Sequence, residues 1–147
     1  IYVIGPYCIL RYLNDIFNTI IFSYQVAQAH VVAEVYVTKA PGDAMRLAET
    51  VVLGKYDGVL IASGDGLVYE WVNGIMKRDD WREALEQMPI GSLPGGSGNA
   101  LAKSVLVEAG DPGAKGTACP FANAAFTALR ARPPYRRIDI AAVDLGG

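Results

Sequence analysis

The sequence contains few of the residues on which metal binding and nucleophilic catalysis most often depend. Its 147 residues include two cysteines, Cys8 and Cys119, and one histidine, His30. Neither cysteine belongs to a C-x-x-C pair, so we expect no cysteine-based zinc site and two reduced thiols, as in an intracellular protein. A single histidine excludes most histidine-rich zinc sites, and it leaves Ser-His-Asp catalysis without support unless a partner group comes from outside this chain.

Positive charge is scarce as well. The 13 lysine and arginine residues are outnumbered by 15 aspartate and glutamate residues, which gives a formal net charge of -2. A protein of this charge lacks the broad basic surface that holds many nucleic-acid phosphates. No nucleic-acid partner is therefore expected.

A long uninterrupted hydrophobic run is also missing. Residues 1–29 are rich in Ile, Tyr and Phe, but polar residues interrupt them before about 18 apolar residues accumulate. No basic segment followed by a cleavage site occurs, so a secretory signal is not indicated. We expect a buried or interfacial helix here in place of a membrane span. The chain begins with Ile1 and not with methionine, which predicts either a fragment of a longer protein or a processed product.

Apolar residues are abundant enough to build one core. Hydrophobic residues make up 52% of the chain, which suits about one domain at this length. Short apolar runs predict strands over residues 31–37, 59–62 and 90–93. Helical spacing predicts helices over residues 44–53, 67–76, 81–88, 99–107 and 122–129. This alternation predicts an α/β fold, a three-layer sandwich with a mainly parallel sheet.

Three further local signals refine this prediction. Asp43 is the expected N-cap of the first helix, and Asp80 with Glu83 three residues later resembles an acidic capping box. Residues 138–143 alternate between faces as a strand does. Four arginines around two prolines in residues 130–137 predict a basic connector before that strand, either solvated or in contact with anionic lipid.

Two glycine-rich turns follow neighbouring predicted strands. Residues 63–66 read S-G-D-G, and residues 95–99 read G-G-S-G-N. Both turns would lie at the carboxyl edge of the sheet, where ligands bind in open α/β folds. Glycines and unpaired amides at helix starts suit phosphate, the Ser97 hydroxyl could donate to it, and Asn99 could cap the following helix. The alternative is that the glycines only provide positive φ angles at sharp junctions.

The carboxylate of Asp65 is unexpected in a phosphate site, because like charges repel. It therefore needs another role, as a magnesium ligand or as the acceptor of a proton from an attacking hydroxyl. Other motifs do not fit the two turns. No G-x-x-x-x-G-K-[ST] sequence occurs, and Tyr69 replaces the third glycine of the dinucleotide fingerprint. Ser97 lacks the final glycine and the later histidine of a hydrolase nucleophile.

Three longer sequence motifs resemble those of a known family. Residues 63–67 read S-G-D-G-L, residues 72–74 read V-N-G, and residues 92–102 read S-L-P-G-G-S-G-N-A-L-A. The region 31–107, with a weaker continuation to residue 143, resembles the catalytic domain shared by diacylglycerol, ceramide and sphingosine kinases. Within that family, S-G-D-G together with G-S-G-N-A-L-A favours the sphingosine kinases.

The resemblance implies transfer of the γ-phosphoryl group of ATP, with Mg²⁺, to the primary hydroxyl of a long-chain base. It implies that Asp65 is the catalytic residue, orienting the lipid hydroxyl and accepting its proton late in the transfer. The residues that would bind the lipid acceptor are Ser63, Gly64 and Gly66. The residues that would bind the nucleotide are Thr38, Glu70, Gly96, Ser97 and Gly98. Without the resemblance, Glu70 reads as a solvated helix residue and Thr38 as a strand end.

The sequence also departs from the family pattern. The family has an N-P-x-x-G-x-G-type loop after its first strand, whereas residues 2–8 contain no such glycine cluster. One nucleotide contact is therefore expected to be absent. We divide the chain into a divergent N-terminal segment (1–30), the nucleotide-binding catalytic domain (31–130), and a linker with the first strand of a further β domain (131–147).

Several expectations follow for the protein as a whole. The piece alone is expected to be inactive, and the full protein is expected to be cytoplasmic and peripherally associated with membranes, where its lipid substrate lies. A diacylglycerol- or ceramide-type kinase remains an alternative, and the G-D-G turn also occurs in NAD kinases. A non-catalytic nucleotide-binding module is the alternative of another class.

Overall fold

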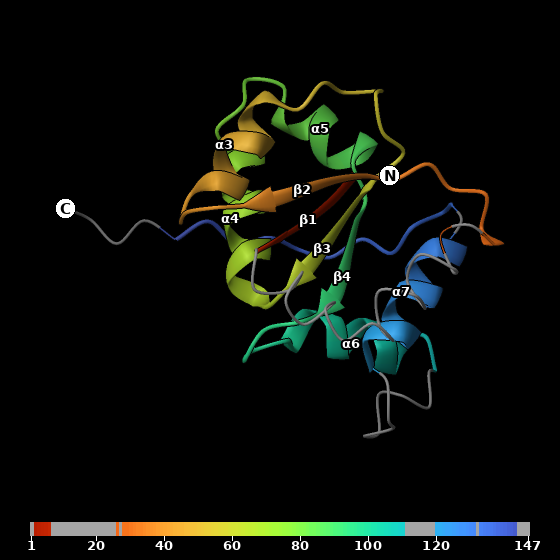
Figure 1. Ribbon diagram of the computed structural model, residues 1–147. Helices are drawn as coiled ribbons and strands as arrows, with labels where there is room; N and C mark the ends of the chain where they lie inside the picture. Colours follow the sequence, from red (N-terminus) through yellow and green to blue (C-terminus); the bar gives the residue numbers. More distant parts are fainter. Residues whose placement is uncertain (1, 7–25, 27, 111–119, 132, 144–147) are drawn as a thin grey trace.

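Four parallel strands form a single sheet in the computed structural model, which describes residues 2–6, 26, 28–110, 120–131 and 133–143 (Figure 1). Their order across the sheet is β2-β1-β3-β4, and every neighbouring pair is parallel. The strands are β1 (Tyr2–Pro6), β2 (Glu34–Thr38), β3 (Val59–Ser63) and β4 (Ile90–Pro94). The mainly parallel sheet expected from the sequence is confirmed.

Helices cover both faces of this sheet, which confirms the three-layer arrangement (Figure 1). They are α3 (Asp43–Thr50), α4 (Asp65–Met76), α5 (Trp81–Gln87), α6 (Ala100–Glu108) and α7 (Pro120–Arg130). Val59 and Ile61 of β3 pack in one buried cluster with α3, α4 and α5, while Leu60 and Ala62 pack in the other with α6 and α7. Successive residues of β3 thus alternate between the two layers, as a central strand requires.

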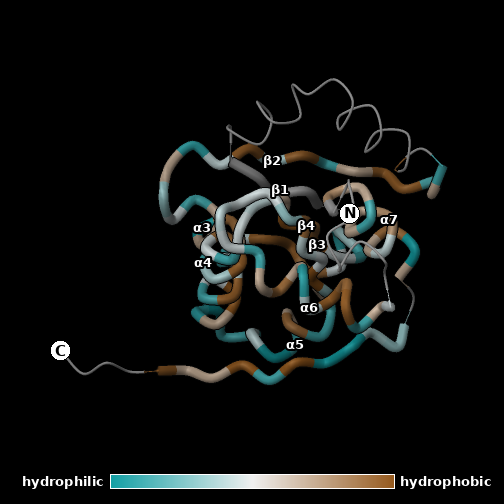
Figure 2. Tube along the Cα trace, turned by 90° about the horizontal axis from the view of Figure 1, so that it is seen from below, coloured by the Kyte–Doolittle hydropathy of each residue, from teal (hydrophilic) through white to brown (hydrophobic). Residues whose placement is uncertain are grey.

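Hydropathy follows this layering (Figure 2). Hydrophobic residues run along the central strands, and hydrophilic residues lie on the outer turns. Trp71 on α4 and Ile61 on β3 are the largest side chains among those almost fully buried. Burying side chains of this size contributes about 1.5–3 kcal/mol each, so the α4–β3 contact is a main source of stability.

One expected helix cap is wrong, and another is correct in position only. Helix α3 begins at Asp43 itself, and its N-cap is Gly42, with φ 82°. The Asp43 carboxylate instead accepts hydrogen bonds from the backbone amides of Lys39 (2.6 Å) and Ala40 (2.9 Å), which precede the helix. Asp80 is the N-cap residue of α5, as expected, but its side chain binds Arg78 and makes no capping hydrogen bond. The helices themselves lie where the periodicity places them, apart from shifts of a few residues at their ends.

The ends of the described chain differ most from expectation. Residues 2–6 form strand β1 in the middle of the sheet and not a helix, so the sheet includes part of the segment 1–30. Residues 7–25, where most of the expected N-terminal helix falls, and both cysteines lie outside the described residues. The expected buried strand at 31–37 begins only at Glu34. Its Val35 is 56% exposed, because β2 is an edge strand.

The segment after α7 is extended but is not a strand. Residues 135–143 pair with no strand in the described part of the chain, and Ile138 and Val143 are exposed. Arg136 forms an ion pair with Glu108 of α6. Arg137 forms another with Glu86 of α5, with 3.8 Å between the Arg137 Nη2 and Glu86 Oε1 atoms. A strand needs a neighbour to complete its backbone hydrogen bonds, so alternation alone does not produce one here. None of the helices in these described ranges is long and apolar enough to cross a membrane.

Candidate functional site

The two glycine-rich turns lie side by side at the carboxyl edge of the sheet. Strands β3 and β4 pair in a register that places Ser63 opposite Pro94, so both strands end at the same level. Just beyond them, the Gly95 amide donates to the Ser63 carbonyl (3.2 Å) and the Asp65 amide donates to the Gly98 carbonyl (3.0 Å). The convergence expected from the sequence is therefore observed.

Gly64 and Gly96 allow this close approach. A Cβ atom added to Gly96 would lie 2.5 Å from the Gly64 nitrogen, and one added to Gly64 would lie 2.6 Å from the Gly98 carbonyl oxygen. Real side chains do not tolerate such distances to backbone atoms. Neither glycine is among the described residues with positive φ, so the alternative explanation by positive φ is wrong for this pair. Their absent side chains serve the contact between the turns.

Asp65 connects the two turns by its side chain. It is the first residue of α4, yet its Oδ2 accepts the amide of Ala100 (2.8 Å) and its Oδ1 accepts the amide of Leu101 (3.1 Å). These amides begin α6, so the Asp65 carboxylate caps a helix 35 residues away in the sequence. A negative charge is favourable there, because unpaired amides and the helix dipole make a helix N-terminus positive.

Asn99 occupies the N-cap position of α6, as expected, but its side chain does not cap the helix. Its side chain instead accepts the Gly96 amide (3.0 Å) and donates to the Gly96 carbonyl (2.6 Å), and it makes no capping hydrogen bond. The second turn is thus braced internally by Asn99 and externally by Asp65. Both braces leave the turn with a fixed shape before any ligand binds.

The remaining hydrogen-bond donors define where an anion can bind. The first amides of α6, expected to be open, are occupied by Asp65. Within the part of the chain that the structure describes, the amides of Ser97 and Gly98 have no hydrogen-bond partner, and both residues are exposed. A Cβ atom added to Gly66 would meet nothing within 4 Å. The open donors therefore lie on the Gly95–Gly98 loop, facing solvent, and this is an arrangement that fits phosphate.

Thr38 and Glu70 lie farther from the two turns. Thr38 is the buried last residue of β2, at the same edge of the sheet but separated from β3 by β1. Glu70 lies on the second turn of α4. Its Oε2 atom is buried and finds no hydrogen-bond partner among the residues described. A fully solvated glutamate is therefore the wrong description of Glu70, since a buried carboxylate oxygen normally has a donor.

A magnesium site is not formed by these residues alone. The described ranges contain no group of three histidine, cysteine, aspartate or glutamate side chains that could hold a metal ion. Both oxygens of Asp65, the carboxylate nearest the loop, already accept backbone amides. Magnesium prefers about six oxygen ligands in octahedral geometry, which one carboxylate does not provide.

Comparison with known proteins now identifies the family. The diacylglycerol kinase catalytic domain family matches residues 17–131, which is most of the chain and includes both turns. The chain belongs to the diacylglycerol kinase catalytic domain family. The fold agrees: the chain superposes on a Bacillus anthracis (strain Sterne) protein assigned as a diacylglycerol kinase with a TM-score of 0.61 and 20% identity. The superposition covers 88% of this chain and 38% of the other.

Curated relatives within this family include several sphingosine kinases. The chain is 36% identical over 118 residues to sphingosine kinase 1 of Arabidopsis thaliana, covering 80% of this chain and 22% of the relative. It is 44% identical over 85 residues to human sphingosine kinase 1, covering 58% and 22%. It is 50% identical over 78 residues to sphingosine kinase 1 of Caenorhabditis elegans, covering 52% and 16%. The chain thus spans about a fifth of the length of the curated relatives it matches.

Three features of this family member were not found from sequence. The long-range cap by Asp65, the brace by Asn99 and the pairing of Gly64 with Gly96 all depend on which turns become neighbours in space. An aspartate in the first turn of a helix predicts interaction with that helix only. The one available signal was the presence of both turns after adjacent strands.

Proposed function

We propose that this chain is the nucleotide-binding half of an ATP-dependent lipid kinase that phosphorylates the primary hydroxyl of sphingosine or a related long-chain base. Family membership and 36–50% identity to sphingosine kinases support the activity and the substrate class. The single observation that carries the proposal is the meeting of the two glycine turns. They bring one carboxylate and a loop of open amides to the same edge of the sheet.

The second turn is the proposed holder of the ATP phosphates. The free amides of Ser97 and Gly98 and the exposed Ser97 hydroxyl are donors of the kind that bind phosphate oxygens. Gly96 contributes by letting the loop lie against the first turn. Because Asp65 and Asn99 already fix this loop, little conformational entropy would be lost when the nucleotide binds.

Asp65 is the proposed acid–base residue. Each carboxylate oxygen has about two acceptor sites, and each accepts a single backbone amide here, so acceptor capacity remains for a lipid hydroxyl. A carboxylate is a far weaker base than an alkoxide, so it would orient the hydroxyl and accept its proton only as the phosphoryl group transfers. Ser63, Gly64 and Gly66 are proposed to lie beside that hydroxyl, with the open side of Gly66 as the point of approach.

Thr38 and Glu70 are the proposed outer contacts of the nucleotide. Glu70 is only half-buried, and Thr38 ends β2 at the same edge of the sheet as the turns, which supports these roles. The enclosed Oε2 of Glu70 would have to turn outward to meet a ribose or base donor. We propose Mg²⁺ as the companion of ATP. The ion would be held mainly by the phosphates and by groups outside the described residues, so no step of the mechanism is assigned to it here.

We further propose that the full protein works in the cytoplasm at a membrane surface, where a lipid acceptor is available, and binds no nucleic acid. Residues 131–147 are the proposed connection to a lipid-binding β domain. The exposed side chains of Ile138 and Ile140, two residues apart, support this, because they would share one face of a strand and could be buried against added strands. We therefore expect the chain by itself to bind nucleotide but not to phosphorylate a lipid.

An acceptor panel tests the proposed function. The full-length protein is incubated with ATP labelled at the γ-phosphate and with sphingosine, diacylglycerol or ceramide in matched detergent micelles. We expect sphingosine to be phosphorylated at least about 10-fold faster than the other two, a preference of about 1.4 kcal/mol. A preference for diacylglycerol or ceramide would contradict the substrate class. ATP binding without phosphorylation of any acceptor would favour a non-catalytic nucleotide-binding module.

A further inference from the structure

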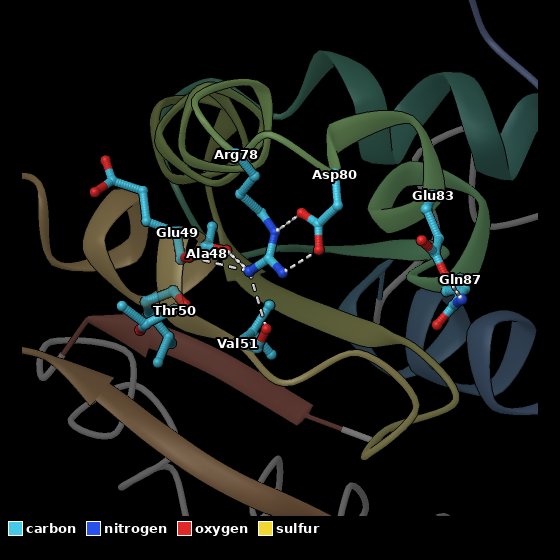
Figure 3. Close-up of polar contacts among 9 residues, drawn as sticks. Ala48, Glu49, Thr50, Val51, Arg78, Asp80, Glu83 and Gln87 are labelled. Atoms are coloured by element: carbon cyan, nitrogen blue, oxygen red, sulfur yellow. Dashed lines mark hydrogen bonds and ion pairs between the residues drawn. The ribbon is translucent and has the colours of Figure 1, made fainter.

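One arginine connects α3, α4 and α5 at the end of α4 that lies farthest from the glycine turns. Arg78 follows α4, and its Nη1 donates to the carbonyls of Ala48 (3.3 Å), Glu49 (3.0 Å) and Val51 (2.9 Å) at the end of α3 (Figure 3). Its Nε and Nη2 donate to the two carboxylate oxygens of Asp80, at 2.7 and 2.9 Å. We call Arg78 and Asp80 the α3 clamp.

The clamp supplies what α3 lacks. The last carbonyls of a helix have no partner within it, and the helix dipole makes that end negative. No basic residue lies in the last turn of α3, so its own sequence provides no charge to balance the dipole. The side chain of Arg78 is only 13% exposed, and the Asp80 hydrogen bonds raise the pKa of Arg78 while Arg78 lowers the pKa of Asp80. Both groups therefore stay ionised across the neutral range.

Helices α3 and α4 pack closely through small residues. Gly74 of α4 lies so close to α3 that an added Cβ would meet the Met45 carbonyl oxygen and lie 2.7 Å from the Ala48 Cβ. Ala44 and Ala48 are fully buried in this contact layer. This packing sets the distance between the helices, and the hydrogen bonds of Arg78 add a directional restraint at the end of α3.

The other end of α3 carries the segment after Thr38. The Asp43 carboxylate accepts the amides of Lys39 and Ala40, which joins this segment firmly to the first turn of α3. Helix α4 begins at Asp65. A displacement of α3 along α4 would therefore move residues 39–42 relative to the first glycine turn.

We propose that Arg78 is a positioning residue for nucleotide binding, which acts by holding α3 and the segment after Thr38 in place relative to Asp65. This rests on the proposed function, in which Thr38, immediately before that segment, contacts ATP. Arg78 itself lies at the far end of α3 from the segment it positions, so its effect is on geometry and not on direct binding. In the proposed function the lipid hydroxyl lies beside Ser63, Gly64 and Gly66 and not beside α3, so we expect the KM for the lipid not to depend on Arg78.

The test compares Arg78→Lys with Arg82→Lys in the full-length protein. Lysine keeps the charge but cannot bind three carbonyls and a carboxylate at once. Arg82 is the matched control, because it is exposed and stacks on the Trp81 ring (4.2 Å). For Arg78→Lys we expect the KM for ATP, and the Kd of a non-hydrolysable ATP analogue measured by titration, to rise about 10-fold. The KM for sphingosine and kcat should stay within about 2-fold, and Arg82→Lys should match the parent.

Other outcomes overturn the inference. An ATP KM and analogue Kd within about 2-fold of the parent in a folded Arg78→Lys protein would show that the clamp does not position the nucleotide segment. A parallel loss of kcat with both KM values unchanged would indicate a loss of folded protein only. If Arg78→Lys fails to fold, Asp80→Asn replaces it with the same criteria. If the parent transfers no phosphate, the proposed function fails, while the analogue Kd still decides the role of Arg78.

Discussion

The two glycine turns look alike in sequence but have different roles in the structure. The first turn, residues 63–66, contributes a side chain to its neighbour: the Asp65 carboxylate leaves its own helix and caps α6. The second turn, residues 95–99, leads into the capped start of α6 and retains open amides of its own. The difference teaches that a glycine-rich turn after a parallel strand is not by itself a phosphate site. Which amides remain free depends on the side chain that the adjacent turn supplies.

The glycines of the two turns also have two different roles. Gly64 and Gly96 are needed for contact between the turns, whereas Gly66 faces open space. A family motif therefore combines positions that serve packing with positions available to a ligand. The following substitutions separate the two kinds of position.

The largest effect on stability is expected for Gly96→Ala. Its Cβ would overlap the backbone of Gly64, and an overpacked contact of this kind costs about 1–3 kcal/mol. Chemical denaturation of the full-length protein measures the cost, and the ATP analogue should bind more weakly because the loop moves.

Gly66→Ala is the matched control for Gly96→Ala. The added methyl group meets nothing within 4 Å and lies at the start of α4, where alanine favours the helix, so stability should change by less than about 0.5 kcal/mol. If both substitutions destabilise the protein equally, the division between packing and ligand-facing glycines is wrong.

Asn99→Ala should have the next largest effect. The substitution removes the two hydrogen bonds to Gly96 that brace the second turn and leaves Asp65 as the remaining brace. We expect a loss of about 1–2 kcal/mol and a several-fold weaker affinity for the ATP analogue. Unchanged affinity for the analogue would show that the shape of the loop does not depend on Asn99.

Ser97→Ala should have the smallest effect on folding. The Ser97 side chain is exposed and has no hydrogen-bond partner within the described ranges, so the free energy of unfolding should not change measurably. The loss of one hydrogen bond to a phosphate oxygen should weaken ATP binding by about 1 kcal/mol, or about 5-fold. A changed unfolding midpoint with unchanged ATP affinity would assign Ser97 a structural role.

Much of this architecture is predictable from sequence, because it depends on local patterns. The apolar run at 59–62 is a central strand buried on both faces, and the helical spacing in 67–76 predicts α4. The position of both turns at one edge follows from parallel pairing alone. These inferences need no knowledge of which side chains meet.

The remainder depends on contacts between distant residues. Asp65 caps α6 instead of its own helix, and Asp80 pairs with Arg78 in place of a capping box. Capping preferences predict that each aspartate accepts an amide of its own helix. In the structure, each carboxylate instead forms its hydrogen bonds with a group outside that helix. The apolar run at 31–37 likewise overestimates the burial of β2, because it does not show that this strand lies at the edge of the sheet.

The most direct test of the account is Asp65→Asn in the full-length protein, with sphingosine phosphorylation, ATP-analogue affinity and unfolding free energy measured on the same preparation. Asparagine keeps one acceptor oxygen for the start of α6, so stability should fall by about 1–2 kcal/mol and analogue affinity should stay within about 3-fold. Turnover should fall by about 10²–10⁴-fold, because the proton acceptor is lost. Turnover equal to that of the parent would contradict the central claim and leave Asp65 as a helix cap only.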